Sequence, residues 1–469
     1  MKAPAMTSKP LPNSTAQRDI ESLVHPYTNL KSHLDDGPLV ISGGEGIYVY
    51  GEDGTQYLES MAGLWCTSLG WGEPRLVEAA TKAMERLPFY HSFTAKVPDV
   101  TVDLAEKLLA LAPVPMGKVF FASSGSEAVD TALKLVWYIN NARGRPLKKK
   151  VIARDKAYHG TTIGAASLTG LAANHSDFDL PISGILRTAC PHHYRFAKPG
   201  ESEEDFATRL ADELEQLIQA EGPDTVAAFI AEPVMGAGGV LVPPATYFAK
   251  IQAVLKKHDI LLIADEVICG FGRTGNMWGS QTFDLKPDMM TMAKALSSAY
   301  LPISALMISE EIFQDLVKQS DTLGIFGHGF TYGGHPVACA LALETLSIYA
   351  ERDILGHVQR VAPTLQDGLA ALQGHPLVGE VRGVGLVGAL ELVRDKTTHE
   401  SFAKEANLGT LVVKLMRDQG MIGRNMGDTI AFSPPLIISD AEVRDMLART
   451  TRALDLAHEA LCADGHIPA

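Results

Sequence analysis

The chain has 469 residues, of which 46% are hydrophobic and 20% charged, and its formal net charge is −14. These values are typical of globular proteins and exclude a disordered, collagen-like or coiled-coil chain. Nucleic-acid binding needs a concentrated basic face, which an acidic composition does not favour, so we expect no nucleic-acid partner. The length suggests about two to four domains.

The cysteines and the N-terminal segment indicate in which cellular compartment the protein is expected. The chain has five cysteines. Their odd number and the lack of a CxxC pair indicate neither a disulfide framework nor a zinc ribbon, and we expect no metal. Residues 1–22 lack the apolar core of a signal peptide, and no apolar run approaches the roughly 18 residues needed to cross a bilayer. We therefore expect a cytoplasmic protein without a membrane partner.

Residues 1–74 are predicted to form an N-terminal arm and a hairpin. Residues 1–24 are polar and rich in Pro, Ser and Thr, which is typical of a mobile arm. Residues 46–61 alternate around Asp53-Gly54, a pattern that predicts a β-hairpin. We expect this hairpin to join a smaller domain formed by the other end of the chain.

Residues 75–345 are predicted to form one large α/β domain. Amphipathic helices are expected at 74–87 and 100–112. Short apolar strands are expected at 118–123, 149–155, 225–233, 259–267, 288–294 and 303–309, with helices between several of them. Buried strands that alternate with helices predict a mainly parallel sheet covered by helices on both faces.

Residues 346–469 show a different pattern, typical of a smaller α+β domain. A helical stretch at 336–373 leads into a strand-rich segment at 377–393, and a further helix is expected at 406–419. The final helix begins at a capping box formed by Ser439 and Glu442.

Two G-x-G-x-x-G motifs, at 270–275 and 383–388, raise the possibility of nicotinamide binding. A dinucleotide fold needs this motif between a strand and a helix. The first motif is followed by residues without helical periodicity, and the second runs into an alternating strand. We therefore interpret both as glycine-rich turns.

Two segments at strand ends could bind a charged ligand. Ser124 and Gly125 follow a predicted strand and open a helix, where backbone N–H groups bind phosphate, although Ser is also a common N-cap. Asp265 and Glu266 end another strand. Adjacent residues of an extended chain point to opposite sides, so only one of these acids can face a given crevice.

Two further residues complete the pattern. Lys294 closes an apolar strand, and burial would lower its pKa and make it a nucleophile for carbonyl groups, although a lysine can also snorkel to the surface. Tyr158 follows a strand, where its ring could stack on a flat ligand or simply pack in the core. A phosphate site, an aspartate, a buried lysine and an aromatic ring together suit pyridoxal 5′-phosphate (PLP).

The sequence resembles the class III (ω-) aminotransferases, which are PLP-dependent enzymes of fold type I. The resemblance covers nearly the whole chain, and its most specific part is LLIADEVICGFGRTG. Further matching segments are LPFYHSF, AYHGTT and FTYGGHP, at 87–93, 157–162 and 330–336. The resemblance implies a large domain with a mainly parallel sheet and a small α+β domain built from both chain ends.

For the cofactor, the resemblance implies that Lys294 forms the Schiff base and that Asp265 pairs with the pyridine nitrogen, as the catalytic residues. The other cofactor-binding positions that it implies are Ser124 and Gly125 at the phosphate, Tyr158 and Val267 on the two faces of the ring, Glu232 in the polar network beside it, and Thr331 donated to the phosphate by a partner subunit. The family therefore implies a homodimer, or a tetramer built from it.

For the substrates, the resemblance implies an amine or ω-amino acid as donor and a keto acid, pyruvate, as acceptor. Tyr27, Trp65 and Phe93 match the aromatic wall of the substrate pocket. Arg424 matches a mobile arginine that binds a carboxylate. A surface arginine in a loop is the alternative reading of Arg424.

Departures from the family pattern occur at Ala157, Ala295 and Ala299, where glycine is common. None of them removes a catalytic group, so they bear on substrate range. The alternatives to a transaminase are an aminomutase or decarboxylase of the same fold, a non-catalytic PLP-binding protein and a nicotinamide oxidoreductase.

Overall fold

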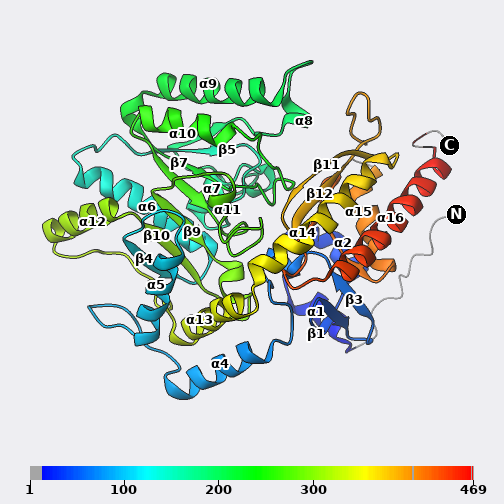
Figure 1. Ribbon diagram of the computed structural model, residues 1–469, viewed down its shortest axis with the longest axis horizontal. Coiled ribbons are helices and arrows are strands. Elements are labelled where there is room, and N and C mark those ends of the chain that lie inside the picture. The colour runs from blue at the N-terminus through cyan, green and yellow to red at the C-terminus, as the bar shows by residue number, and fades with distance from the viewer. Residues whose placement is uncertain (1–12, 404–405, 466, 468–469) are drawn as a thin grey trace.

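The computed structural model describes residues 13–403, 406–465 and 467, and Figure 1 shows a large lobe and a smaller lobe. The predicted mobile arm falls partly outside these residues, since 1–12 are not described. Its later part forms helix α1 (Thr15–Ser22), whose N-cap Ser14 accepts a hydrogen bond from the Gln17 N–H.

The large lobe is built on a seven-stranded sheet of order β4-β10-β9-β8-β7-β5-β6. Its strands are β4 (Lys118–Ala122), β5 (Lys150–Arg154), β6 (Ile185–Thr188), β7 (Val226–Ala231), β8 (Leu261–Asp265), β9 (Met289–Met292) and β10 (Ser304–Ile308). Only β10 runs antiparallel to its neighbours, so the predicted mainly parallel sheet is confirmed. Strand β6 escaped prediction because it is short and only its last residue is buried.

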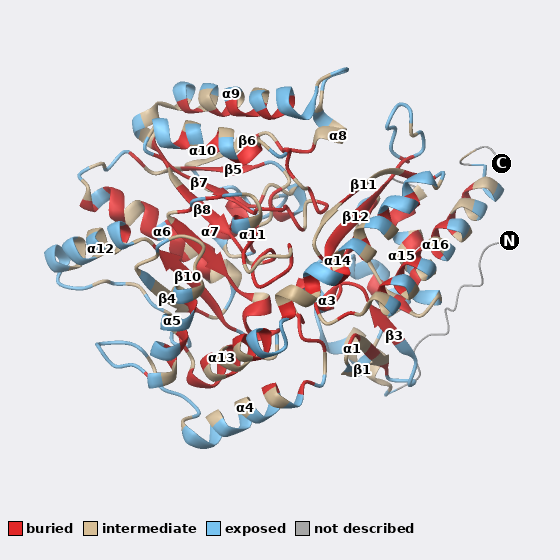
Figure 2. Ribbon diagram, in the orientation of Figure 1, coloured by how far each residue is buried: buried red, intermediate tan, exposed pale blue. Residues whose placement is uncertain are grey.

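Helices cover both faces of this sheet, and the central strands are buried throughout (Figure 2). Strand β10 sends Ala305 and Met307 into one core and Leu306 and Ile308 into the other. The first core is covered by α5 (Asp99–Leu111), α9 (Glu203–Glu221), α10 (Tyr247–Lys257) and α13 (Pro336–Glu351), the second by α6 (Gly125–Ala142), α7 (Ile163–Leu168) and α12 (Glu310–Leu323). Helix α4 (Pro74–Arg86) packs against α13.

Short helical segments connect these elements. They are α8 (His193–Phe196), α11 (Gly279–Thr282), η1 (Ala172–Asn174), η2 (Pro223–Thr225) and η3 (Lys294–Ser297). Within the described ranges, no helix combines the length and apolarity needed to span a membrane.

The smaller lobe contains two four-stranded sheets, β1-β2-β3-β13 and β11-β12-β15-β14. Their strands are β1 (Ile41–Glu45), β2 (Tyr48–Gly51), β3 (Gln56–Glu59), β11 (Val378–Val384), β12 (Val387–Leu392), β13 (Met421–Ile422), β14 (Arg424–Met426) and β15 (Thr429–Phe432). Its helices are α1, α2 (Leu30–Asp36), α3 (Ala62–Trp65), α14 (Ile354–Ala371), η4 (Leu372–Gly374), α15 (Leu408–Asp418) and α16 (Asp440–Ala463). Strand β13 pairs in parallel with β3, so both ends of the chain share a sheet. The domain limits at 74 and 345 stay a prediction.

The single helical stretch predicted at 336–373 is wrong in one respect. Helix α13 ends at Glu351 and α14 begins at Ile354, because Asp353 between them adopts a left-handed conformation with φ of 49°. The Asp353 side chain then caps α14 by accepting from the Gly356 N–H at 3.2 Å. The capping box predicted at Ser439 and Glu442 is confirmed.

The prediction that Lys294 closes a strand is also wrong. Strand β9 ends at Met292, and Lys294 opens η3 with φ of 46°. Ser298 and Ala299 follow with φ of 48° and 62°. These left-handed residues turn the chain back at the edge of the sheet, and Ala299 holds a conformation that glycine adopts without cost.

We expect Ala299→Gly to stabilise the protein by about 0.5–1 kcal/mol, because glycine removes the backbone strain of a left-handed alanine. The greater flexibility of the unfolded glycine variant offsets part of this gain. Thermal unfolding at one scan rate would measure the shift. The matched control is Ala295→Gly, at a buried position without positive φ, which should lower the midpoint. A lower midpoint for Ala299→Gly would contradict this account of the turn.

Candidate active site

Five turns of the chain converge at one edge of the large sheet. Strands β4, β5, β7, β8 and β9 point the same way, so their carboxyl ends meet at this edge, where ligands bind in open α/β sheets. A cavity of about 120 Å³ opens there. Six of the predicted cofactor-binding positions line it, namely Gly125, Tyr158, Glu232, Asp265, Val267 and Lys294.

The carboxylate of Asp265 is buried and surrounded by donors. Its Oδ2 lies 2.7 Å from Nδ1 of His159, and its Oδ1 accepts from the Val267 N–H at 3.1 Å and from the Thr291 hydroxyl at 3.2 Å. The other ring nitrogen of His159, Nε2, is buried without a hydrogen-bond partner among the described residues. This arrangement fixes the carboxylate at the floor of the cavity.

The neighbouring acid, Glu266, points to the other side of the strand. It accepts hydrogen bonds from the N–H groups of Gly279 and Ser280 at 2.9 and 2.6 Å. Burial raises the pKa of Glu266 to about 7. The expectation that only one of the two acids faces the crevice is therefore confirmed, and the acid that does so is Asp265.

The Lys294 amine lies in the cavity with Asp265. Burial lowers the pKa of Lys294, while the negative charges of Asp265 and Glu232 oppose this effect. Across the described part of the chain, no hydrogen-bond acceptor or ion-pair partner holds its Nζ. A lowered pKa and an amine without a partner are the features expected of a lysine that attacks a carbonyl group.

The N-terminus of helix α6 forms the opposite end of the site. The Ser124 hydroxyl accepts from the Glu127 N–H at 3.2 Å, so Ser124 acts as the N-cap. The N–H groups of Gly125 and Ser126 belong to the first turn, which has no intrahelical acceptors and carries the positive end of the helix dipole. A Cβ at Gly125 would lie 3.2 Å from both Val267 methyl groups. Phosphate binding at this turn stays a prediction.

Glu232 fixes the backbone that carries Tyr158. Its Oε1 accepts from the Tyr158 N–H at 3.0 Å, and its Oε2 accepts from the Gly236 N–H at 3.0 Å. Burial raises the pKa values of Glu232 and of Tyr158. The tyrosine ring is thus held at the cavity wall.

Two of the predicted substrate residues lie beside Tyr158. The Tyr27 ring contacts it edge-on with centroids 6.5 Å apart, and the Tyr27 hydroxyl accepts from the Asn174 amide at 2.6 Å. Arg424 on β14 is half-buried, and burial lowers its pKa, an effect that Tyr158 and Tyr27 oppose. None of the carboxylates that the structure describes forms an ion pair with Arg424.

Trp65 is buried in a cluster with Ile268, which lines the cavity. The backbone turn that carries Trp65 is left-handed, since Trp65 itself has φ of 66°. The Glu59 carboxylate holds this turn by accepting from the N–H groups of Met61 and Gly63 at 3.1 and 2.5 Å. Burial raises the pKa of Glu59 to about 7.

Thr331 and Phe93 do not line the cavity. Both are exposed, and they belong to two loops in mutual contact, since a Cβ at Gly329 would lie 3.0 Å from the Phe93 ring. The single chain therefore does not bring these two predicted residues to its own site.

Sequence analysis missed three residues that shape the site. His159 and Thr291 hold Asp265, and the Ser126 hydroxyl accepts from the Thr161 N–H at 3.0 Å. Thr291 had a usable signal, because it is the one hydroxyl inside the apolar strand MMTM. His159 lies in the segment AYHGTT beside Tyr158, and its contact with Asp265 has no signal in the spacing along the chain.

Known proteins of one family are similar to nearly the whole chain. The family model for aminotransferase class-III matches residues 31–454. The chain belongs to the class III aminotransferases. Fold type I and dependence on PLP follow for this aminotransferase, as the sequence resemblance implied.

Among its relatives, the aminotransferase is 53% identical to "Gamma-aminobutyrate transaminase 1, mitochondrial" of Oryza sativa subsp. japonica, over 95% of this chain and 87% of the relative. It is 53% identical to "Gamma aminobutyrate transaminase 1, mitochondrial" of Solanum lycopersicum, over 92% and 84%. Among solved structures, the omega transaminase of Pseudomonas jessenii in complex with PMP matches with TM-score 0.94 and 54% identity, over 95% of this chain and 98% of that one.

The residues at the cavity fit PLP. Unpaired helix N–H groups suit its phosphate, the Asp265 carboxylate suits its ring nitrogen, and the amine of Lys294 suits its aldehyde. When bound, PLP supplies an electron sink that stabilises negative charge at the carbon bearing the amino group. With PLP bound, the Asp265 carboxylate would face the ring nitrogen, His159 would orient that carboxylate, and the Lys294 amine would accept and return the proton at the substrate carbon.

We expect Asp265→Asn to lower kcat by at least about 100-fold, because the amide keeps the size of the side chain and removes its preorganised charge. The matched control is Glu266→Gln, which removes the adjacent acid on the opposite side of the strand and should keep kcat within a few-fold. Steady-state rates of purified, cofactor-loaded variants would measure both. Equal losses in the two variants would mean that Asp265 acts through the fold.

Proposed function

We propose that this aminotransferase takes the amino group from an amine or ω-amino acid and transfers it to pyruvate. Transamination follows from the family, whereas the donor class and the acceptor are inferred from the pocket. The observation that carries the proposal is Arg424, a half-buried cation without a carboxylate partner among the described residues, beside Tyr158 and Tyr27. A keto acid would supply that carboxylate.

The two half-reactions place opposite demands on Arg424. A donor without an α-carboxylate leaves a fixed, buried guanidinium unpaired, which is costly. The long side chain of Arg424 starts from a short strand of three residues and is only half-buried, so it has a route to solvent. The aromatic rings of Tyr27 and Trp65 would then bury the apolar part of the donor.

Relatives support the donor class. The names of the plant relatives specify gamma-aminobutyrate, an ω-amino acid. A thermostable omega transaminase, 53% identical with TM-score 0.95, was engineered for bulky amines by substituting one tryptophan, one phenylalanine and one arginine. In this chain Trp65, Phe93 and Arg424 have the same residue types at the same spacing, which favours their assignment to the substrate pocket.

We also propose a homodimer, in which Thr331 and Phe93 of each chain serve the partner's site. The loops that carry them expose several large apolar side chains, and such a patch is typical of an interaction surface. These side chains are Phe89, Tyr90, Phe93, Val97, Ile325 and Tyr332. The rings of Phe89 and Tyr332 contact each other with centroids 5.6 Å apart, so the two loops form one surface.

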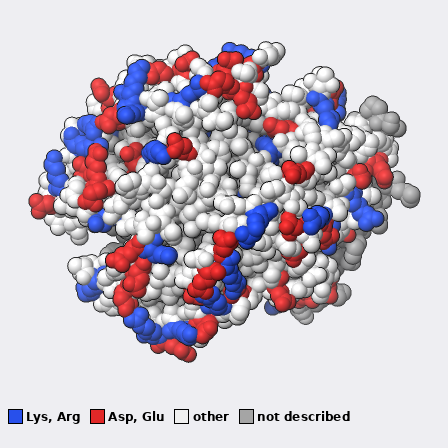
Figure 3. All heavy atoms as spheres, viewed as in Figure 1, with Lys and Arg blue, Asp and Glu red and all other residues white. Residues whose placement is uncertain are grey.

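Charged side chains of both signs are mixed on one face of the protein. On the face shown in Figure 3, acidic and basic side chains of the described residues are interspersed around a largely uncharged middle, without an extended basic patch.

A donor panel tests the proposed reaction. The holoenzyme is incubated with pyruvate and with amines or ω-amino acids in turn, and alanine and the carbonyl product are quantified. One alanine formed per donor consumed is the expected result. Donor conversion without consumption of pyruvate, as in a decarboxylase or an aminomutase, would overturn the proposal.

Arg424→Ala should raise the KM for pyruvate by at least about tenfold, because one charge-assisted contact to the carboxylate is lost. The single-turnover half-reaction with a carboxylate-free amine, followed by cofactor absorbance, should change little. Arg417→Ala, at an exposed arginine on α15, is the matched control and should leave both unchanged. If Arg424→Ala damages both half-reactions equally, Arg424 supports the fold or the cofactor instead.

Mixed dimers test the shared site. When Lys294→Ala and Thr331→Ala chains exchange subunits, one site receives both lesions and the other receives neither. Activity of the mixture should therefore exceed that of either parent. After subunit exchange has been verified by mass, activity no higher than the mean of the parents would show that Thr331 does not act across the interface.

A further inference from the structure

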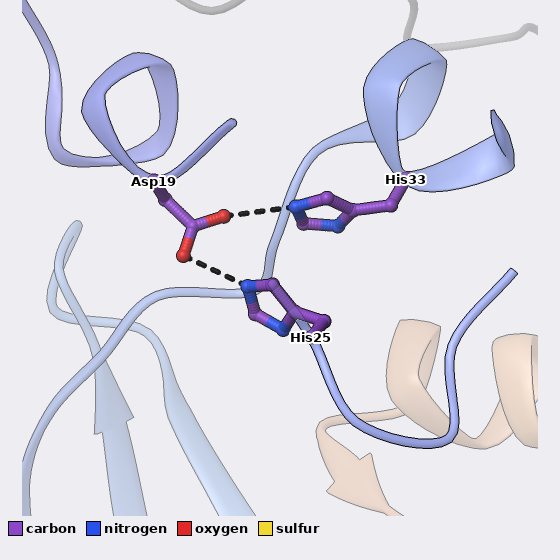
Figure 4. Close-up of side chains that lie close together, drawn as sticks. All are labelled: Asp19, His25 and His33. Atoms are coloured by element: carbon purple, nitrogen blue, oxygen red, sulfur yellow. Dashed lines mark hydrogen bonds and ion pairs between the residues drawn. The ribbon is translucent and has the colours of Figure 1, made fainter. Parts of the chain in front are cut away.

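Three side chains near the N-terminus converge in a cluster that the transamination site does not use. Asp19 lies on α1, His33 on α2 and His25 on the segment between them (Figure 4). The Asp19 carboxylate oxygens lie 2.8 Å from Nε2 of His25 and 2.9 Å from Nε2 of His33. The three ligand atoms all lie within 4.8 Å of one another.

We propose that Asp19, His25 and His33 bind a divalent transition-metal ion, for which Zn²⁺ is the best match. Two imidazole nitrogens and one carboxylate oxygen are preferred zinc ligands, at about 2.0–2.2 Å from the ion. In a tetrahedral site such ligands lie about 3.3 Å apart, and the three atoms, which lie within 4.8 Å of one another, would adjust to that spacing. The His25 side chain is 26% exposed, which admits water as a fourth ligand.

The two imidazole rings can present lone pairs to an ion without being deprotonated. In the hydrogen-bonded cluster each Nε2–H donates to Asp19, and metal binding requires the ring proton to sit on Nδ1. Neither the His25 nor the His33 Nδ1 is engaged in a hydrogen bond with the described residues, so that tautomer gives up only the two hydrogen bonds to Asp19, which bonds to the ion would replace.

A second histidine-carboxylate group provides a contrast. His192, Glu380 and Glu391 also place ligand atoms within 4.8 Å of one another. The Arg382 guanidinium, however, pairs with Glu380 at 2.6 Å and with Glu391 at 2.8 Å, so a positive charge already occupies that group. No lysine or arginine in the described ranges forms an ion pair with Asp19, whose negative charge is left for an ion.

Metal binding would fasten α1 to α2 and restrain the segment between them. That segment carries Tyr27, which contacts Tyr158 at the cavity. The ion would therefore hold one wall of the substrate pocket in place. This consequence, unlike the site itself, rests on the proposed role of Tyr27 in substrate binding.

Equilibrium dialysis of tag-free holoenzyme against Zn²⁺, with bound metal measured by mass spectrometry, tests the site. Wild type should bind one ion per chain. Binding of that ion should be at least about tenfold weaker in each of three variants, Asp19→Asn, His25→Gln and His33→Gln. The matched control is His192→Gln, which should bind as wild type does. His25 is partly exposed, so its variant stays informative if His33→Gln misfolds.

Zinc uptake is measured without turnover, so its outcome is independent of the substrate assignment. Uptake that is absent from wild type, or equal in His25→Gln and wild type, would overturn the proposed site. Amide hydrogen exchange tests the consequence, because Zn²⁺ should slow exchange in residues 23–29 of wild type and not of His25→Gln. Unchanged exchange in zinc-bound wild type would overturn the restraint on Tyr27.

Discussion

A carboxylate buried at the end of a strand is costly unless donors surround it, and Asp265 satisfies this constraint with three groups. The Asp265 carboxylate accepts from the Val267 N–H and the Thr291 hydroxyl, and it lies within hydrogen-bond distance of Nδ1 of His159. The parallel sheet makes this possible, because β7, β8 and β9 end side by side and bring residues from distant segments to one edge. We propose that this carboxylate sets the place of the cofactor's ring nitrogen.

The residues that we propose for substrate binding come from the other lobe and from the chain's beginning. Arg424 lies on β14, which pairs with β15, while Tyr27 comes from the N-terminal segment. Pairing of β3 with β13 holds these two chain ends together. On this proposal, cofactor chemistry and substrate choice are carried by different parts of the fold, so the substrate wall can vary while Asp265 and Lys294 stay in place.

Sequence periodicity predicted six of the seven strands of the large sheet, because buried apolar strands are local features, and the family resemblance completed the set of six predicted residues that line the cavity. It failed where conformation depends on tertiary packing. The left-handed turn at Lys294 and the break at Asp353 have no periodic signal. The role of His159 depends on a contact with Asp265 across 106 residues, which spacing along the chain does not encode.

The central claim is that the Lys294 amine, held in the cavity with Asp265, is the group that attaches PLP. Reducing the holoenzyme with borohydride and mapping the pyridoxyl-labelled peptide tests this claim most directly. The account predicts one labelled residue, Lys294, and no label after Lys294→Ala. A label on any other lysine of the wild-type protein would contradict it.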